Sequence, residues 1–147
     1  MSKHAHAIII IKNEKGEYLQ YFDDRWNSFL FPNCKLISNN HLDILKDSLK
    51  SKFHLHFDNL EIEYVTDKVH SKFSESARIE KEYHHYFYKV NAKLQQNLNS
   101  KKFVVENTPY IWLSLSELET DKRIQQVNHD IVEYIKEIES VNNTKSI

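Results

Sequence analysis

Residues 6–22 read HAIIIIKNEKGEYLQYF, and this stretch says the most about the fold. His6–Ile11 is apolar and largely β-branched, which predicts a strand that is buried on both of its faces. Asn13–Gly16 supplies the residues of a tight turn, and Glu17–Phe22 predicts a second strand after it. The sequence therefore predicts a β-hairpin near the start of the chain.

The rest of the chain carries two helical patterns among further strands. A helix is predicted over 41–53, where apolar residues recur at spacings of three and four, with N-cap candidates in Ser38–Asn40. A loop is predicted over 23–27, short apolar or strand segments over 29–32, 60–69, 82–90, 102–105 and 110–115, a helical turn at 116–118 and a closing helix over 127–140. This order predicts an α+β (mixed α/β) fold.

Composition limits the possible classes of function. The 147 residues fit one domain, expected over 1–141 with a frayed tail over 142–147, and the formal charge of −1 gives no reason to expect nucleic acid or a membrane as partner. Gly16 is the only glycine, which excludes the Gly-rich phosphate loops of P-loop and dinucleotide-binding proteins. The single cysteine, Cys34, excludes an intramolecular disulfide, and the sequence shows no signal peptide, so a cytoplasmic location is expected.

Three segments, in this order, resemble the Nudix (MutT-like) hydrolase family over roughly residues 5–140. Ala7–Tyr21 is similar to the family's opening hairpin, and 25–35, with Trp26, Pro32 and Lys35, is similar to its W-x-x-P-G-G-K segment. Ile111–Leu118 is similar to its later W-x-x-x-x-E-L segment. The resemblance implies a mixed sheet sandwiched between helices.

The family's catalytic motif, the Nudix box, ends in R-E-U-x-E-E-x-G-U, where U is aliphatic and the glutamates bind Mg²⁺. When Leu49 and Leu55 are aligned with the two U positions, none of the motif's charged residues is kept. Asp47 replaces the arginine, Ser48, Ser51 and Lys52 replace the three glutamates, and His54 replaces the glycine. Upstream, Asn33-Cys34 replaces Gly-Gly, Asn39 or Asn40 replaces the first glutamate, and only Lys35 matches. The box is therefore interpreted as degenerate, with no catalytic residue carried over.

The chemistry of this helix face leads to the same expectation. Positions 48, 51 and 52 share one face of an α-helix, and they offer two hydroxyls and an ammonium where Mg²⁺ prefers carboxylate oxygens. We therefore expect no metal and no cofactor at the box. Mg²⁺ is expected only if the chain is a divergent hydrolase that uses other groups.

Four residues outside the box helix are candidates for binding a nucleotide-like ligand. Arg25 and Lys35 could meet a phosphate, although both also suit an exposed surface. Glu82, with Glu80, could supply a base or a metal ligand, or could simply begin a solvated strand. Tyr86 lies on an aromatic strand whose alternate residues could stack a nucleobase, pack in a core or form a subunit interface.

Histidines and the cysteine are weaker candidates. If the backbone is extended, His4 and His6 would share one face, and so would His54 and His56. The neighbours His84 and His85 would point to opposite faces. Structural roles for these histidines are favoured over a zinc site. Nothing local to Cys34 would activate it as a nucleophile.

Three functional hypotheses follow. The first is a non-catalytic Nudix-type module that binds a nucleotide-like ligand or a protein partner, with a homodimer possible. The second is a divergent hydrolase of nucleoside diphosphate-linked substrates that uses acids or histidines outside the box. The third is a purely structural or interaction protein that uses an aromatic sheet face.

Overall fold

The computed structural model describes residues 2–74, 79–94, 98 and 100–145. The strands are β1 (Ser2–Ile10), β2 (Tyr18–Asp23), β3 (Ser28–Leu30), β4 (Asn33–Lys35), β5 (Phe57–Ser74), β6 (Ile79–Leu94), β7 (Lys102–Val105) and β8 (Thr108–Leu113). The helices are α1 (His41–Asp47), the π-helical segment η1 (Ser48–Lys52) that continues it, α2 (Leu115–Thr120) and α3 (Lys122–Lys145). Among these residues no helix is both long enough and apolar enough to cross a membrane.

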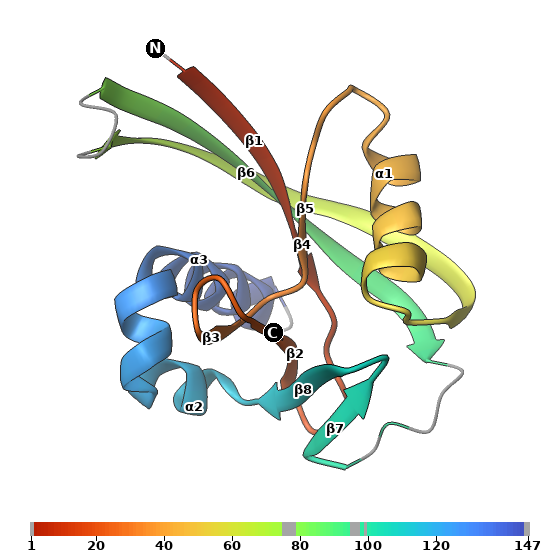
Figure 1. Ribbon diagram of the computed structural model, residues 1–147. Coiled ribbons are helices and arrows are strands. Elements are labelled where there is room, and N and C mark those ends of the chain that lie inside the picture. Colours follow the sequence, from red (N-terminus) through yellow and green to blue (C-terminus); the bar gives the residue numbers. More distant parts are fainter. Residues whose placement is uncertain (1, 75–78, 95–97, 99, 146–147) are drawn as a thin grey trace.

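The strands form two four-stranded sheets. Sheet A has the order β4-β1-β6-β5, with β1 parallel to β6 and the other pairs antiparallel. Sheet B has the order β3-β2-β8-β7 and is antiparallel throughout. Helices α1 and η1 lie on one side of sheet A, and α3 lies on the other (Figure 1). The α+β class with mixed pairing that the sequence predicts is therefore confirmed.

The predicted hairpin over residues 6–22 forms only at its turn. Gly16 adopts φ 78°, Lys12 bridges to Tyr18, and the backbone N–H of Leu19 donates to the carbonyl of Ile11 at 2.9 Å. Beyond this point β1 enters sheet A and β2 enters sheet B. The predicted pairing was wrong because both hydrogen-bonding edges of β1 are occupied, one by β4 and the other by β6.

Alternate residues of β1 enter two separate hydrophobic cores. Ala7 and Ile9 pack with α1, η1 and one side of sheet B, so we name this side of sheet A the α1 face. Ile8 and Ile10 pack with α2 and α3 on the opposite side, which we name the α3 face. This arrangement explains why the strand is apolar at successive positions, as the sequence predicted.

The helix predicted over 41–53 is present but not uniform. Leu45, Leu49 and Phe53 of its apolar stripe are buried, whereas Leu42 is 45% exposed. The helix begins after Asn40, yet no side chain caps it. After Asp47 the turn widens, and the N–H of Phe53 donates to the carbonyl of Ser48, five residues earlier.

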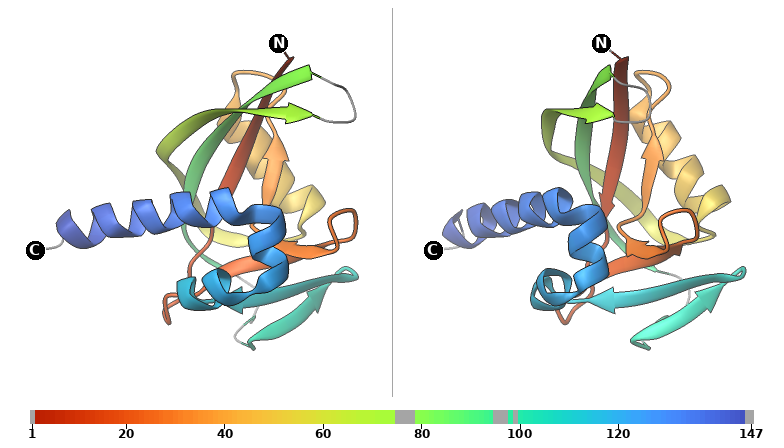
Figure 2. Two further views of the ribbon diagram at one scale, coloured as in Figure 1. Left: turned by 90° about the vertical axis from the view of Figure 1, so that its left-hand side faces the viewer. Right: turned by 60° about the vertical axis from the view of Figure 1, so that its left-hand side comes forward.

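Strands β5 and β6 and the last helix extend beyond their predicted limits. β5 and β6 form a long antiparallel pair, and β5 carries irregularities at Asp58/Glu61 and Tyr64/Thr66. Strand β7 lies at the edge of sheet B. Helix α3 begins at Lys122, changes direction at Asn128 and runs to Lys145, so it enters the predicted frayed tail; residues 146–147 lie outside the described residues (Figure 2).

Candidate functional site

The residues that replace the motif's glutamates do not converge on one point. Ser48 is buried and lies in hydrogen-bond contact with the thiol of Cys34 on β4. Ser51 is exposed, and its hydroxyl donates to the carboxylate of Asp47 at 3.2 Å. Of the three positions expected to share one face, Ser48 is buried whereas Ser51 and Lys52 are both exposed, and the segment is a π-helix where the expectation assumed an α-helix.

Lys52 is one of two lysines of this segment, and its ammonium lies against protein. The ammonium donates a hydrogen bond to the main-chain carbonyl of Asn33 at 3.1 Å. It also lies 4.9 Å from the ring centroid of Phe53 and 5.6 Å from that of Tyr21. Lys52 as a residue is exposed, yet its ammonium lies among protein atoms, and their burial of the charge is the main cause that lowers the pKa of Lys52 from its ordinary value.

The backbone at His54 bears on the alignment with the box. His54 stands where the motif has its last glycine, and its φ of 54° lies in the left-handed region that favours glycine. The flanking aliphatic positions Leu49 and Leu55 are 1% and 2% exposed. Both observations agree with the register in which Lys52 stands at a glutamate position.

A pocket of about 290 Å³ opens beside Lys52, and we name it the Lys52 pocket. Its cations are Arg25 and Lys52. Its aromatic rings belong to Tyr21, Phe22 and Phe53. The candidate Arg25, which lies in the 23–27 turn, therefore meets a box residue that is 27 positions away in the sequence.

Asp23 shapes the wall of the Lys52 pocket. Its carboxylate accepts hydrogen bonds from the Tyr21 hydroxyl at 2.9 Å and from the backbone N–H groups of Arg25 and Trp26 at 2.9 and 3.2 Å. Burial raises the pKa of Tyr21, so this hydroxyl stays protonated and donates. The Tyr21 oxygen in turn accepts from the side-chain amide of Asn33 at 3.1 Å. These bonds fix the turn that carries Arg25.

The other three candidates lie elsewhere. Lys35 is exposed at the end of β4, in register with His6 of β1. Glu82 and Tyr86 both lie on β6, and by strand alternation both are on the α1 face, about 13 Å apart at the usual rise per residue. The structure thus brings Arg25 to the box helix, and the candidates do not form one site. The side chain of Glu80 lies outside the described residues.

Asp67 and His84 form a carboxylate–imidazole pair on the α1 face that was not predicted from the sequence. His84 Nε2 lies 2.5 Å from the carboxylate of Asp67, which also accepts from the hydroxyl of Tyr64. The ring of His84 stacks on Tyr86 at 4.1 Å. Hydrogen bonds from Tyr64 and His84 lower the pKa of Asp67. The irregularity between Tyr64 and Thr66 sets this register, and no local sequence signal predicts it.

Histidines of the α3 face lie together but do not suggest a metal centre. His4 stacks on Tyr83 at 5.2 Å, and His70 stacks on His85 at 5.1 Å. His84 and His85 point apart, as predicted. His54 has a left-handed backbone, so the extended geometry in which His54 and His56 would share a face does not occur. No group of three or more potential ligands that could hold a metal ion occurs among the described residues.

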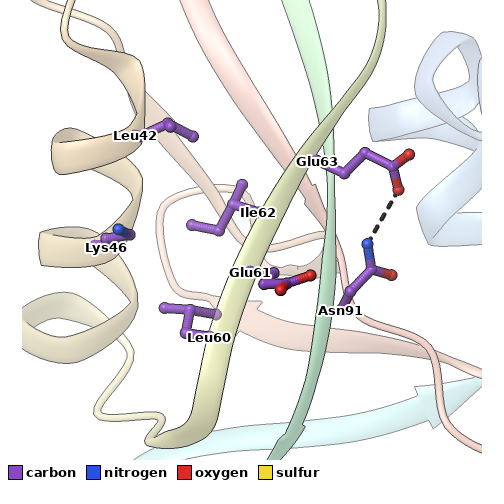
Figure 3. Close-up of a pocket in the computed structure, with 7 residues that line it drawn as sticks. All are labelled: Leu42, Lys46, Leu60, Glu61, Ile62, Glu63 and Asn91. Carbon is purple, nitrogen blue, oxygen red and sulfur yellow. Dashed lines mark hydrogen bonds between the residues drawn. The ribbon is translucent and has the colours of Figure 1, made fainter.

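Two further features complete the survey of candidates. Burial raises the pKa of the Cys34 thiol, which opposes a nucleophilic role. An open groove of about 510 Å³ lies between α1 and β5, with Leu42 and Lys46 facing Leu60 and Ile62 across it (Figure 3). None of the candidates named from the sequence lines this groove.

Comparison with known proteins places the fold. No protein-family model and no curated protein sequence matches the chain. Among solved structures, a NUDIX hydrolase from Nitrosomonas europaea aligns with TM-score 0.57 and 12% identity over 96% of this chain and 90% of that one. A MutT protein from Methanosarcina mazei Go1 aligns with TM-score 0.55 and 15% identity over 96% of both chains.

A third structure is the bifunctional NMN adenylyltransferase/ADP ribose pyrophosphatase from Francisella tularensis. It aligns with TM-score 0.52 and 11% identity over 92% of this chain and 41% of that one. The chain therefore has a Nudix-like fold.

Proposed function

We propose that this Nudix-like fold serves as a non-catalytic module that binds a nucleotide-like ligand. The observation that carries the proposal is the Lys52 ammonium, which is held against Phe53 and Tyr21 at a position where the motif has a metal-binding glutamate. The left-handed backbone of His54 supports that register. The degenerate box is part of the proposal.

The side chains at the box positions 48, 51 and 52 do not fit Mg²⁺. This ion takes oxygen ligands at short distances in near-octahedral geometry, usually with carboxylates among them. Here Ser48 is turned toward Cys34, and Ser51 donates to Asp47. Lys52 adds a positive charge, and like charges about 4 Å apart repel by about 1 kcal/mol in water and by several times more when partly buried. Divalent metal is therefore disfavoured at this site.

The Lys52 pocket supports the binding half of the proposal. It brings together two cations, the groups that suit a phosphate, beside aromatic residues of which Tyr21 and Phe53 are buried in the core. The Francisella protein is by its name an ADP ribose pyrophosphatase, which makes ADP-ribose a reasonable first ligand to test on this chain.

The test is a panel of nucleoside triphosphates and nucleoside diphosphate-linked compounds, with Mg²⁺, Mn²⁺ or EDTA. We expect no release of phosphate or nucleotide above the protein-free control under any condition. We expect at least one compound to raise the melting temperature, because a ligand that binds only the folded state stabilises it. Release that depends on a divalent ion would contradict the non-catalytic proposal, and a panel without any thermal shift would contradict ligand binding.

The divergent hydrolase remains the second candidate, and the Asp67–His84 pair favours it, because an imidazole oriented by a carboxylate can act as a general base. If the panel detects hydrolysis, its loss in both Glu82→Gln and His84→Gln would support this alternative. Retained hydrolysis in both variants would remove it. Assembly as a homodimer stays a prediction.

A further inference from the structure

We propose that the Lys52 ammonium takes the place of a divalent cation, so that the Lys52 pocket holds the phosphate end of its ligand without any metal. This inference rests on the proposed function, because it assigns the mode of binding at the same site. It follows from what surrounds Lys52, Arg25 and Asp23.

The charge of Lys52 is only partly satisfied within the protein. An ammonium has three N–H donors, and one of them binds the carbonyl of Asn33. The rings of Phe53 and Tyr21 lie within 5.6 Å and stabilise the cation without neutralising it. Over the described parts of the chain, Lys52 forms no salt bridge. An anion in the pocket could therefore take the remaining donors.

Arg25 supplies a second cation to the same pocket. Its backbone N–H is fixed to Asp23, and its side chain lines the pocket without a salt bridge to any residue that the structure describes. A guanidinium offers a planar fork of donors that matches two phosphate oxygens, whereas an ammonium acts as a point charge. Lys52 and Arg25 together suit a diphosphate better than a monoanion.

The acidic wall does not cancel these cations. Asp23 uses its carboxylate to accept three hydrogen bonds from Tyr21, Arg25 and Trp26, so its oxygens hold the turn. Asp24 also lines the pocket, and because Asp24, Arg25 and Lys52 are all exposed residues, water screens the charges of all three. Among the described residues neither aspartate forms a salt bridge with Lys52 or Arg25, so donors of both cations remain available to an anion.

The size of the Lys52 pocket defines which part of a ligand it can take. Its volume of about 290 Å³ is at the lower end of the range for small-molecule sites. It therefore suits the diphosphate group, while a nucleoside would extend beyond the pocket. Inorganic pyrophosphate is the minimal probe for this subsite.

The experiment is a calorimetric titration of inorganic pyrophosphate into the full chain in EDTA. We expect binding in EDTA that excess Mg²⁺ does not strengthen, because a metal would have to displace or approach the Lys52 charge. We expect Lys52→Gln to weaken binding by about tenfold or more, the effect of losing one partly buried charge contact. Lys50→Gln removes an exposed lysine of the same turn and should leave the affinity unchanged.

Three results would overturn the inference: no binding of pyrophosphate in EDTA, binding that requires Mg²⁺, or equal affinity in the wild type and Lys52→Gln. Thermal melting checks that the Lys52→Gln variant folds. If this variant does not fold, the Arg25→Gln variant is used in its place. We expect Arg25→Gln to bind pyrophosphate more weakly than the wild type, and unchanged affinity would contradict the inference. A nucleotide that raises the melting temperature of the wild type and of Lys52→Gln equally would contradict this inference and leave the proposed function standing. Metal-dependent hydrolysis would instead remove the proposed function.

Discussion

The hydroxyl of Tyr110 donates a hydrogen bond to the main-chain carbonyl of Phe53 at 2.8 Å, with both residues 1% exposed. The bond joins β8 of sheet B to the residue that follows η1. Because Lys52 immediately precedes Phe53, the same contact fixes the backbone next to the Lys52 pocket. Sheet B thereby holds the end of the helix in place.

Tyr110→Phe should lower the free energy of unfolding by about 1 kcal/mol, because it leaves a buried carbonyl without its partner. Urea denaturation measures the change. Tyr83→Phe is the control, since the hydroxyl of Tyr83 has no hydrogen bond to a described residue. Equal stability of Tyr110→Phe and the wild type would show that the bond contributes nothing.

Two leucines of α1 form a matched pair for testing the core. Leu45 is fully buried and Leu42 is 45% exposed, three residues apart on the same helix. Leu45→Ala should cost about 2–5 kcal/mol of stability through lost burial and the cavity left behind, whereas Leu42→Ala should cost less than about 1 kcal/mol. Similar losses for both variants would contradict the observed orientation of α1.

Helix α2 begins with a capping box that mutation can test. The Ser114 hydroxyl accepts from the N–H of Glu117 at 3.2 Å, and the Glu117 carboxylate accepts from the N–H of Ser114 at 3.0 Å. Ser114→Ala should lower stability by about 1 kcal/mol. Ser116→Ala, at an exposed position of the same helix, should change it little. Chemical denaturation that ranks the two variants in reverse order would refute the cap.

The pH dependence of stability should include a contribution from His6. Burial, and then the nearby charges of His4, Lys35 and Lys52, lowers its pKa below the ordinary value of 6.5. The unfolded chain therefore binds a proton more readily, so this contribution is complete above 6.5 and is lost as pH falls toward the folded-state pKa. His6→Gln should lose less stability than the wild type between about pH 7.5 and 5.5. If the free energy of unfolding changes with pH equally in the wild type and in His6→Gln, this contribution of His6 is contradicted.

Local patterns in the sequence predicted individual elements well. The stripe ending at Leu49 and Phe53 gave the box helix, because side chains three and four apart share a helix face. The apolar run ending at Ile11 predicted a strand with two buried faces. The pairing of β1 with β4 and β6 could not be predicted, because those partners lie elsewhere in the chain.

The candidate site could be predicted in part. The sequence alone suggested an alignment that sets Lys52 at a glutamate position, and it also offered Arg25 as a cation for a phosphate. The pocket that combines them depends on the Asp23 turn, and the rings beside Lys52 depend on how sheet B packs against η1. The Asp67 partner of His84 depends on a strand irregularity, which propensity and alternation do not report.

The most direct test of the account is whether a divalent cation binds beside Lys52. Paramagnetic Mn²⁺ broadens the NMR signals of nearby amides, so a titration of the assigned protein reports each residue separately. The account predicts that the amide signals of 48–52 keep their intensities relative to the rest of the chain, because Ser48 and Ser51 hold other partners and Lys52 is positively charged. Selective broadening of these signals at low Mn²⁺ concentration would contradict it.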